Sequence, residues 1–390
     1  MIGVGNQGGP SNNLKYFHKN VVAVCDVDTN YLARAVAFQE KGGAESPKTY
    51  DDFRKVLDAK DIDAVVVTVP DHWHMLMTVM ACEAGKHVYC EKPLTLTIAE
   101  GPKMIAAARK NKRIVQTGSM QRSGREFQVG VDLVHKGAVG KVHTVKVGLP
   151  KPNWTNYQID AKKGQKERRP VPDSKPPAEL NWDMWLGPAP ERAYNPQRVH
   201  YLFRFFWDYS GGQQTNFGAH HLDIAQWGLG MDESGPVSIE GKGKYHPQGF
   251  YETPDTTEIK YTYANSVVMH CGQAYEQGAE FIGDKGSLFI GRGKLTSKPG
   301  EIIKNVEWKK KGDPLPNLTH IDNFYECIKS GKLPVCDVAI GHRSATVCHL
   351  GNLAIRTGHT ITWDPAKEAI IDDVDAAKML TKEYRKPWVM

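Results

Sequence analysis

The stretch that decides the fold is Gly3-Val4-Gly5-Asn6-Gln7-Gly8, followed by the apolar run VVAVC at residues 21–25 and then by Asp26. The six residues match G-x-G-x-x-G, in which the glycines permit a tight turn, a close approach to a pyrophosphate and helix–strand packing. A helix beginning there offers free N–H groups to phosphates. Asp26 stands where a carboxylate binds ribose hydroxyls and repels a 2′-phosphate, so the pattern favours NAD. The alternative interpretation of Asp26 is a turn or helix cap.

Outward from this motif, the first part of the chain alternates short apolar strands with amphipathic helices. Continuous apolar strands of this kind predict an α/β fold with a doubly wound parallel sheet covered on both faces. The predicted strands are 21–25, 64–69, 87–90 and 113–117, and the predicted helices are 31–41, 52–59, 73–84 and 97–111.

The pattern changes near residue 120, so we expect two domains, residues 1–119 and residues 120–390. Later strands alternate apolar and polar residues, which predicts an α+β domain with a large, mostly antiparallel sheet that has one open face. Residues 151–182 are rich in Pro, Trp and charge and predict a long loop. The predicted strands of this part are 142–149, 237–245, 257–263, 266–271, 279–282 and 287–290, and the helices are 124–136, 318–329 and 337–357.

Composition excludes several classes of protein. Apolar residues make up 40% of the 390 residues and charged residues 24%, as in globular proteins. The net charge of +6 is mild, and we expect no nucleic-acid partner, although the basic run 162–169 could contact an anion. No long apolar window predicts a membrane span. The seven cysteines are scattered and form no CxxC pair, so we expect them in the core without disulfides or zinc.

Two further motifs follow predicted strands and therefore lie at the ligand-binding edge of the sheet. Pro70-Asp71-His72-Trp73-His74 comes directly after the second of these strands. Here His74 is interpreted as a nicotinamide-ribose contact, or as a capping or packing residue. The third strand delivers Glu91-Lys92-Pro93 to the same edge. A lysine there can transfer a proton or stabilise an alkoxide, because burial lowers its pKa. Pro93 fixes the turn, and a cis peptide bond before it is compatible with that role.

These motifs resemble those of the Gfo/Idh/MocA family of NAD(P)-dependent oxidoreductases. The resemblance extends to Gly218-Ala219-His220-His221-Leu222-Asp223 and to Phe281-Ile282-Gly283-Asp284-Lys285-Gly286-Ser287-Leu288, so it covers almost the whole chain. It implies an N-terminal Rossmann domain with NAD as cofactor. It also implies that Lys92 and His220 are the catalytic residues at a sugar hydroxyl, and which of the two takes the proton stays open.

The resemblance and the motifs together name the candidate binding residues. For the cofactor they are Gly3, Gly5, Asn6, Gln7, Gly8, Asp26, Thr68, Pro70, His72, His74, Glu91, Lys92 and Gln121. For the substrate they are Arg122, Arg204, Tyr209, Asn216, His220 and His320. The tryptophans Trp182, Trp185 and Trp227 are interpreted as core residues. No third ligand at a suitable spacing joins the two adjacent histidines, so we expect no metal.

The chain departs from the family at one position. Many members have D-x-G-x-H, but position 216 here is Asn. An amide can orient an imidazole or bind a hydroxyl, but it cannot stabilise an imidazolium by charge. Asp223, three residues after His220, is a second candidate for orienting the ring if the segment is helical.

The expected function is hydride transfer between NAD and a hydroxyl of a sugar, polyol or glycoside. One alternative is redox-assisted glycoside cleavage through a transient 3-keto sugar with recycled NAD, and another is a non-catalytic NAD-sensing regulator. The family implies a homodimer or homotetramer formed through the second-domain sheet. Only two residues precede Gly3, so we expect a truncated first strand. As it stands, the sequence predicts a cytoplasmic protein, whereas a removed export signal would place it in the periplasm.

Overall fold

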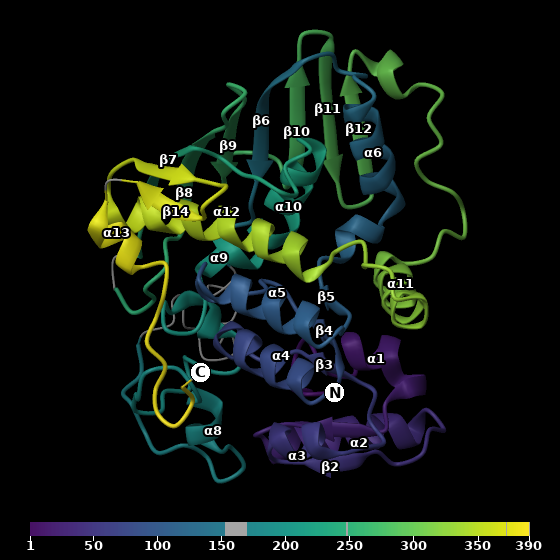
Figure 1. Ribbon diagram of the computed structural model, residues 1–390, viewed down its shortest axis with the longest axis vertical. Coiled ribbons are helices and arrows are strands. Elements are labelled where there is room, and N and C mark those ends of the chain that lie inside the picture. Colours follow the sequence, from purple (N-terminus) through teal and green to yellow (C-terminus); the bar gives the residue numbers. More distant parts are fainter. Residues whose placement is uncertain (153–169, 247–248, 372, 390) are drawn as a thin grey trace, which may run out of the picture.

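The first part of the chain folds around a parallel sheet, as its apolar strand runs predict. The computed structural model describes residues 1–152, 170–246, 249–371 and 373–389; the basic run 162–169 lies outside these ranges. Each strand is short, all but β2 are largely buried, and each is followed by a helix or a 3₁₀ turn (Figure 1). The strands are β1 (Ala23–Cys25), β2 (Lys48–Tyr50), β3 (Ala64–Val67), β4 (His87–Cys90) and β5 (Val115–Thr117).

Ile2 joins these strands into one sheet. It pairs in parallel with Cys25 of β1 on one side and with Val67 of β3 on the other. The Ile2 amide donates to the Val66 carbonyl at 2.8 Å, and the Gly3 amide donates to the Cys25 carbonyl at 2.8 Å. The order β2–β1–Ile2–β3–β4–β5 is that of a doubly wound fold. The short first strand therefore still completes the centre of the sheet.

Two helices of the first domain begin at acidic caps. The side chain of Asp28 accepts a bond from the Asn30 amide at the start of α2, and Asp52 caps α3 in the same way. The helices are α1 (Asn13–Phe17), α2 (Thr29–Lys41), α3 (Phe53–Asp58), α4 (His74–Glu83) and α5 (Glu100–Lys110). Short 3₁₀ turns are η1 (His18–Asn20), η2 (Asp71–Trp73) and η3 (Met120–Ser123).

The second domain is built on a nine-stranded sheet of order β12-β11-β10-β6-β9-β8-β7-β13-β14, in which only β6 and β9 pair in parallel. Its strands are β6 (Val142–Gly148), β7 (Ser238–Lys244), β8 (Thr256–Thr262), β9 (Val268–Gly272), β10 (Gly278–Gly283), β11 (Gly286–Gly291), β12 (Lys294–Lys298), β13 (Ile361–Asp364) and β14 (Ala369–Ile371). The two-domain α/β prediction is therefore confirmed. The strands β2, β12, β13 and β14 were not predicted, because short polar segments carry little periodic signal.

Helices α6 (Arg125–His135), α10 (Gly218–Gly228) and α12 (Val338–Thr357) pack on one face of this sheet. Figure 1 shows α12 running between the sheet and the helices of the first domain. The opposite face carries half-buried polar side chains such as Lys146 and Glu280. A single chain leaves the expected dimer or tetramer a prediction. The remaining elements are α8 (Trp182–Leu186), η5 (Leu202–Phe205), α9 (Gly212–Asn216), η6 (Gly300–Ile303), α11 (Pro316–Ser330) and α13 (Val374–Lys378).

Residues 179–206, which we call the covering segment, belong to the second domain but lie on the first. Leu180 forms an antiparallel bridge with Asp28, and the Asn181 amide donates to the Val27 carbonyl at 2.9 Å. The segment has its own apolar cluster, which includes Trp185, Phe203 and Phe206. Trp185 is buried as expected, while Trp182 and Trp227 are only half-buried. The predicted long loop thus ends in an ordered segment that spans both domains.

The cysteines behave as the sequence predicts. All seven are free and buried. Among the described residues, no helix is long and apolar enough to cross a membrane.

Arg122 is held inside the second domain by two carboxylates instead of facing a substrate, so its assignment to the substrate site is wrong. Its guanidinium is 3% exposed and binds Asp223, which is fully buried, at 2.8 Å, and Asp232 at 2.6 Å. Asp223 also accepts a bond from Ser344 of α12. Both carboxylates already bind the guanidinium and offset its charge, so it is not available to an anionic ligand. Asp223 is likewise engaged here and does not bind the His220 ring.

We expect Arg122→Met to lower the free energy of unfolding by about 3–5 kcal/mol, because it leaves the buried Asp223 carboxylate without its cation. Denaturant unfolding measures this loss. Lys48→Met is the matched control, since Lys48 pairs with Asp61 at 2.8 Å on an exposed surface and its loss should leave the free energy of unfolding nearly unchanged. Equal losses in the two variants would contradict the structural role of Arg122.

Candidate active site

The glycine-rich turn is shaped by close backbone contacts. Gly3 has φ of +81°, and a Cβ atom there would lie 2.9 Å from the backbone of Thr68. A Cβ atom on Gly8 would lie 1.8 Å from the Gly3 carbonyl oxygen. Larger residues therefore cannot form this turn. The first and third glycines act as the motif predicts, and they leave an open cradle of backbone beside β1 and β3.

The helix expected directly after this turn begins later than predicted. Residues 6–12 form turns, and α1 begins only at Asn13 and is five residues long. Pro10 lacks an amide hydrogen, and the neighbouring Gly, Ser and Asn residues favour turns over helix. Phosphates at this site would therefore be bound mainly by the amides of the turn.

Asp26 lies at the end of β1 and faces the glycine-rich turn. One carboxylate oxygen accepts the Val4 amide at 2.7 Å, and the other accepts the Asp28 amide at 3.0 Å. Burial raises the pKa of Asp26 to about 6, although these amide bonds oppose the shift. The carboxylate is therefore held in place and stands where ribose hydroxyls would bind it.

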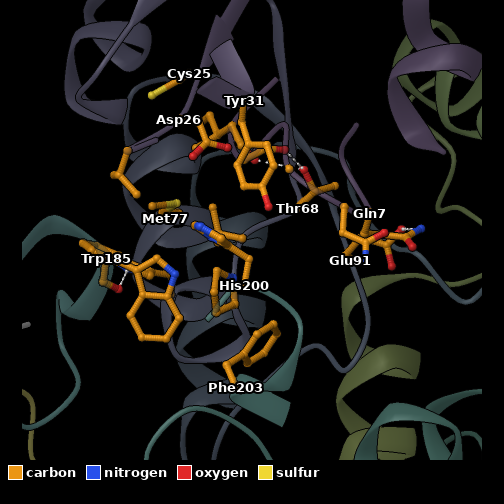
Figure 2. Close-up of a pocket in the computed structure, with 18 of the residues that line it drawn as sticks. Gln7, Cys25, Asp26, Tyr31, Thr68, Met77, Glu91, Trp185, His200 and Phe203 are labelled. Carbon is orange, nitrogen blue, oxygen red and sulfur yellow. Dashed lines mark hydrogen bonds between the residues drawn. The ribbon is translucent and has the colours of Figure 1, made fainter. Parts of the chain in front are cut away.

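Both ends of a dinucleotide site open into one cavity with about 990 Å³ of empty space (Figure 2). Asp26 lies at one end, and Glu91 and Lys92 lie at the other. The predicted residues that line it are Gly3, Gly5, Asn6, Gln7, Asp26, Thr68, Pro70, Glu91, Lys92 and Arg204. The cradle and the carboxylate fit NAD.

Glu91 and Thr68 brace the cavity wall. Glu91 accepts bonds from the side-chain amides of Asn13 at 2.8 Å and Gln7 at 3.3 Å. Thr68 donates to the carbonyl of Gly3, which fixes the turn against β3. In Figure 2, Gln7 and Glu91 lie side by side, away from Asp26. The two residues position the glycine-rich turn relative to Lys92.

His72 and His74 are structural, which corrects their assignment to the cofactor. His72 is 2% exposed, its Nε2 lies 3.1 Å from the Trp185 carbonyl, and burial lowers its pKa to about 3. The ring nitrogens of His74 face two carbonyl oxygens, of Pro93 at 2.7 Å and of Val69 at 3.0 Å. Burial opposes a charge on His74, but its contacts with Cys90, Asp71 and Pro93 raise its pKa to about 10. A charged ring donates to both carbonyls and ties two sheet-edge loops together.

Lys92 reaches across the domain boundary. It follows β4, and the peptide bond between Lys92 and Pro93 is cis, as the motif allowed. Its ammonium donates to two oxygens of Asn216, the backbone carbonyl and Oδ1, each at 3.0 Å. Burial lowers the pKa of Lys92 to about 8, a shift that Glu91 opposes and Arg204 reinforces. The lysine can therefore release or accept a proton near neutral pH.

His220 lies on the far side of Lys92 at the start of α10. Its ring is 4% exposed, and its buried Nδ1 has no partner among the described residues. Burial, Lys92 and Arg292 all lower its pKa well below the usual value. Gln121 was assigned to the cofactor, but it lies outside the NAD cavity and links His220 to Arg292. Its side-chain N–H donates to the His220 carbonyl at 3.2 Å, and its side-chain oxygen accepts from Arg292 at 2.9 Å.

The remaining substrate candidates divide into two groups. Arg204 lines the cavity beside the aromatic rings of Tyr201 and Phe203. Tyr209 is fully buried within the covering-segment cluster, and His320 is fully buried between Ser123 and the Thr117 carbonyl. Tyr209 is fully enclosed by apolar neighbours, and both ring nitrogens of His320 are already engaged, so neither side chain is open to a substrate. Both are packing residues.

Several lining residues were missed because they come from distant parts of the chain. Figure 2 shows Trp185, His200 and Phe203 of the covering segment opposite Asp26 and Tyr31. His200 lies 3.1 Å from Asp28 and packs edge-on against Tyr31. No local pattern marks these residues, although the aromatic richness of the segment was a signal. The other missed lining residues are Asp51, Phe53, Asp71, Trp73, Met77 and Met184.

The fold and the cavity define a two-domain dinucleotide-binding protein of oxidoreductase architecture. Two family models match it: "Oxidoreductase family, NAD-binding Rossmann fold" over residues 1–119, and "Oxidoreductase family, C-terminal alpha/beta domain" over residues 129–390. The chain belongs to the Gfo/Idh/MocA oxidoreductase family, and NAD is its cofactor.

Curated relatives match mainly the first part of the chain. Inositol 2-dehydrogenase of Salmonella typhimurium is 36% identical over 122 residues, which are 31% of this chain and 35% of that protein. A glycosyl hydrolase family 109 protein of Shewanella putrefaciens is 31% identical over 172 residues, 42% of this chain and 37% of that protein. The chain thus spans little more than a third of these relatives.

Solved structures share the fold over both domains. Levoglucosan dehydrogenase in complex with NADH and levoglucosan has a TM-score of 0.67 at 17% identity, covering 93% of this chain and 97% of that one. The WlbA dehydrogenase of Bordetella pertussis, in complex with NADH and UDP-GlcNAcA, has a TM-score of 0.66 at 18% identity, with the same coverage. Identity this low supports a shared fold only.

We expect NAD affinity to fall about tenfold per pH unit below pH 6, because the raised pKa of Asp26 leaves its carboxyl protonated there and only the ionised form accepts both ribose hydroxyls. Calorimetric titration between pH 5 and about 8 measures this dependence. Asp26→Asn should bind NAD more weakly, and its NAD affinity should no longer fall with the protonation of residue 26. Asp61→Asn, an exposed control, should keep this pH dependence. An unchanged slope in Asp26→Asn would contradict the role of Asp26.

Proposed function

We propose that this protein oxidises a hydroxyl of a sugar, polyol or glycoside, with NAD as the hydride acceptor. The observation that carries the proposal is the placement of Lys92, which lines the NAD cavity and is held by Asn216 of the second domain. Bound NAD accepts a hydride at its nicotinamide ring. The chain has to remove the hydroxyl proton at the same carbon, and it needs a base at that end of the cavity.

Lys92 is the stronger base of the two candidates. With a pKa of about 8, a useful fraction of the side chain is neutral near physiological pH. His220 holds a proton far less readily, because burial and the neighbouring Lys92 and Arg292 disfavour its charged form. In this mechanism Lys92 takes the hydroxyl proton. The neutral His220 ring orients the hydroxyl by hydrogen bonding.

Asn216 holds the ammonium of Lys92 without adding a negative charge. Its two oxygens accept hydrogen bonds from the ammonium but carry no full charge. An aspartate at this position would form an ion pair and favour the protonated lysine. The departure from the family pattern therefore makes Lys92 a better base at neutral pH.

We expect kcat/KM for hydroxyl oxidation to rise with pH up to about 8, as Lys92 loses its proton. In Asn216→Asp, a carboxylate next to the ammonium should move this rise up by about 1–2 pH units. Steady-state rates of NADH formation across the pH range measure the shift. Asn265→Asp, a substitution in the exposed β8–β9 turn, is the matched control and should leave the profile in place. An identical profile in Asn216→Asp would show that Lys92 is not the titrating base.

A second candidate function is redox-neutral glycoside cleavage. The observation that favours it is the covering segment, whose Trp185, His200 and Phe203 close the NAD cavity against the first domain. A retained cofactor can take a hydride from the sugar C3 carbon and later return it. The C3 ketone acidifies the C2 proton, whose removal expels the C1 substituent. Water then adds to C1, so the net reaction is hydrolysis. The glycosyl hydrolase family 109 relatives point the same way.

Gel filtration followed by mass spectrometry distinguishes the two candidates. The redox-neutral function predicts that NAD stays with the protein, that no NADH accumulates with a glycoside, and that the released sugar carries solvent deuterium at C2. Trp185→Ala should then release NAD faster, because it opens the covered side of the cavity. Trp182→Ala is the control, since Trp182 stacks on Trp185 at 4.9 Å without lining the cavity. Stoichiometric NADH would rule this function out.

A further inference from the structure

We infer that the substrate carries an anionic group and that Arg292 binds it beside Lys92. The inference rests on the proposed function and names the chemical class of its substrate. Arg292 follows β11 at the edge of the large sheet, and its guanidinium meets the Gln121–His220 link. It was not among the residues predicted from the sequence, and it lies outside the cavity assigned to NAD.

Arg292 is held in place, unlike an ordinary surface arginine. Its Nε donates to Gln121 Oε1 at 2.9 Å, and the Gln121 amide donates in turn to the His220 carbonyl at 3.2 Å. The guanidinium lies over the Phe217 ring with a centroid distance of 5.6 Å. Gln121 itself is 2% exposed. These contacts fix the guanidinium relative to the catalytic histidine.

The other two nitrogens of this guanidinium remain available to a ligand. The side chain is exposed, and only its Nε takes part in a hydrogen bond among the described residues. Within the described ranges, no carboxylate lies within 4.0 Å of Arg292 or Arg204. Arg122 is the contrast, since two carboxylates occupy it. A guanidinium that is held in place and has no counterion suits an anion with two oxygens that accept a pair of hydrogen bonds.

The charges around Lys92 are not balanced. Lys92, Arg204 and Arg292 contribute three cations, and none of them forms an ion pair among the described residues. The two nearby carboxylates, Asp71 and Glu91, accept hydrogen bonds from neutral groups, so three cations face at most two negative charges. Asp71 accepts a bond from Ser210, and Glu91 accepts bonds from the amides of the glycine-rich region.

The titration of the catalytic groups supports a positive site. Arg204 and Arg292 both lower the pKa of Lys92, against the opposing effects of Glu91 and Asp71. Arg292 and Lys92 also lower the pKa of His220. An anionic ligand would offset this positive potential, which a neutral sugar cannot do. A sugar carboxylate or a sugar phosphate would each supply the required pair of charged oxygens.

The experiment compares three probes on the NAD-loaded protein: methyl β-glucuronide, glucose 6-phosphate and methyl β-glucoside. Calorimetry measures binding, and nicotinamide absorbance measures hydride transfer. We expect at least one anionic probe to bind about 10- to 100-fold more tightly than the glucoside, as a charged hydrogen-bonded pair would give. The preferred probe identifies the group as carboxylate or phosphate. In Arg292→Gln, the ratio of the two affinities should fall to near one.

Arg356→Gln is the matched control. Arg356 is also exposed and packed on an aromatic ring, that of Trp207 at 4.8 Å, but it borders a different cavity and should leave the ratio unchanged. If neither anionic probe binds more tightly than the glucoside, or if Arg292→Gln keeps the preference, the inference is overturned. Hydride transfer from the glucoside in that case would leave the proposed function standing. Binding of an anionic probe without any hydride transfer would instead count against the proposed function.

Discussion

The reaction centre depends on a lysine of one domain being held by an amide residue of the other. Lys92 belongs to the parallel sheet, while both of its acceptor oxygens belong to Asn216 at the end of α9. Neither domain alone contains the site. The docking of the domains must therefore be rigid, and close backbone packing makes it so. A Cβ atom on Gly341 of α12 would lie 2.0 Å from Thr117 of β5, and one on Gly101 of α5 would lie 1.9 Å from His342.

The covering segment makes a second contact between the domains at the opposite end of the cavity. Its bridge to Asp28 sits next to Asp26, the residue that faces the ribose. The same short loop after β1 therefore caps α2, carries the cofactor carboxylate and docks the segment that closes over it. Cofactor binding and domain docking are coupled through this loop, because a shift of Asp28 would move both.

Much of the fold and part of the site could be predicted from the sequence. The parallel strands, the glycine-rich turn, Asp26 and Lys92 were all marked by local patterns, because each depends on its immediate neighbours in the chain. The histidines were not predictable in the same way. His72, His74 and His320 differ from His220 only in which carbonyls or hydroxyls the folded chain brings to their rings. Trp185 and His200 were missed as lining residues because they lie more than 90 residues from the motifs that they join, and Arg292 was missed because it lies 72 residues after His220.

The effect of having Asn216 in place of a carboxylate depends on the charged groups around it. In isolation the amide removes one negative charge and weakens an acid–base pair. It leaves Lys92, Arg204 and Arg292 as three cations that act on one another without an ion pair among the described residues, with Arg292 outside the NAD cavity. Such an arrangement is unfavourable until something negative arrives. A protein that stabilised Lys92 by its own aspartate would meet an anionic substrate with less net attraction. The amide therefore serves two requirements at once, since it keeps the lysine basic enough to take a proton and leaves the positive charge of the site for the substrate.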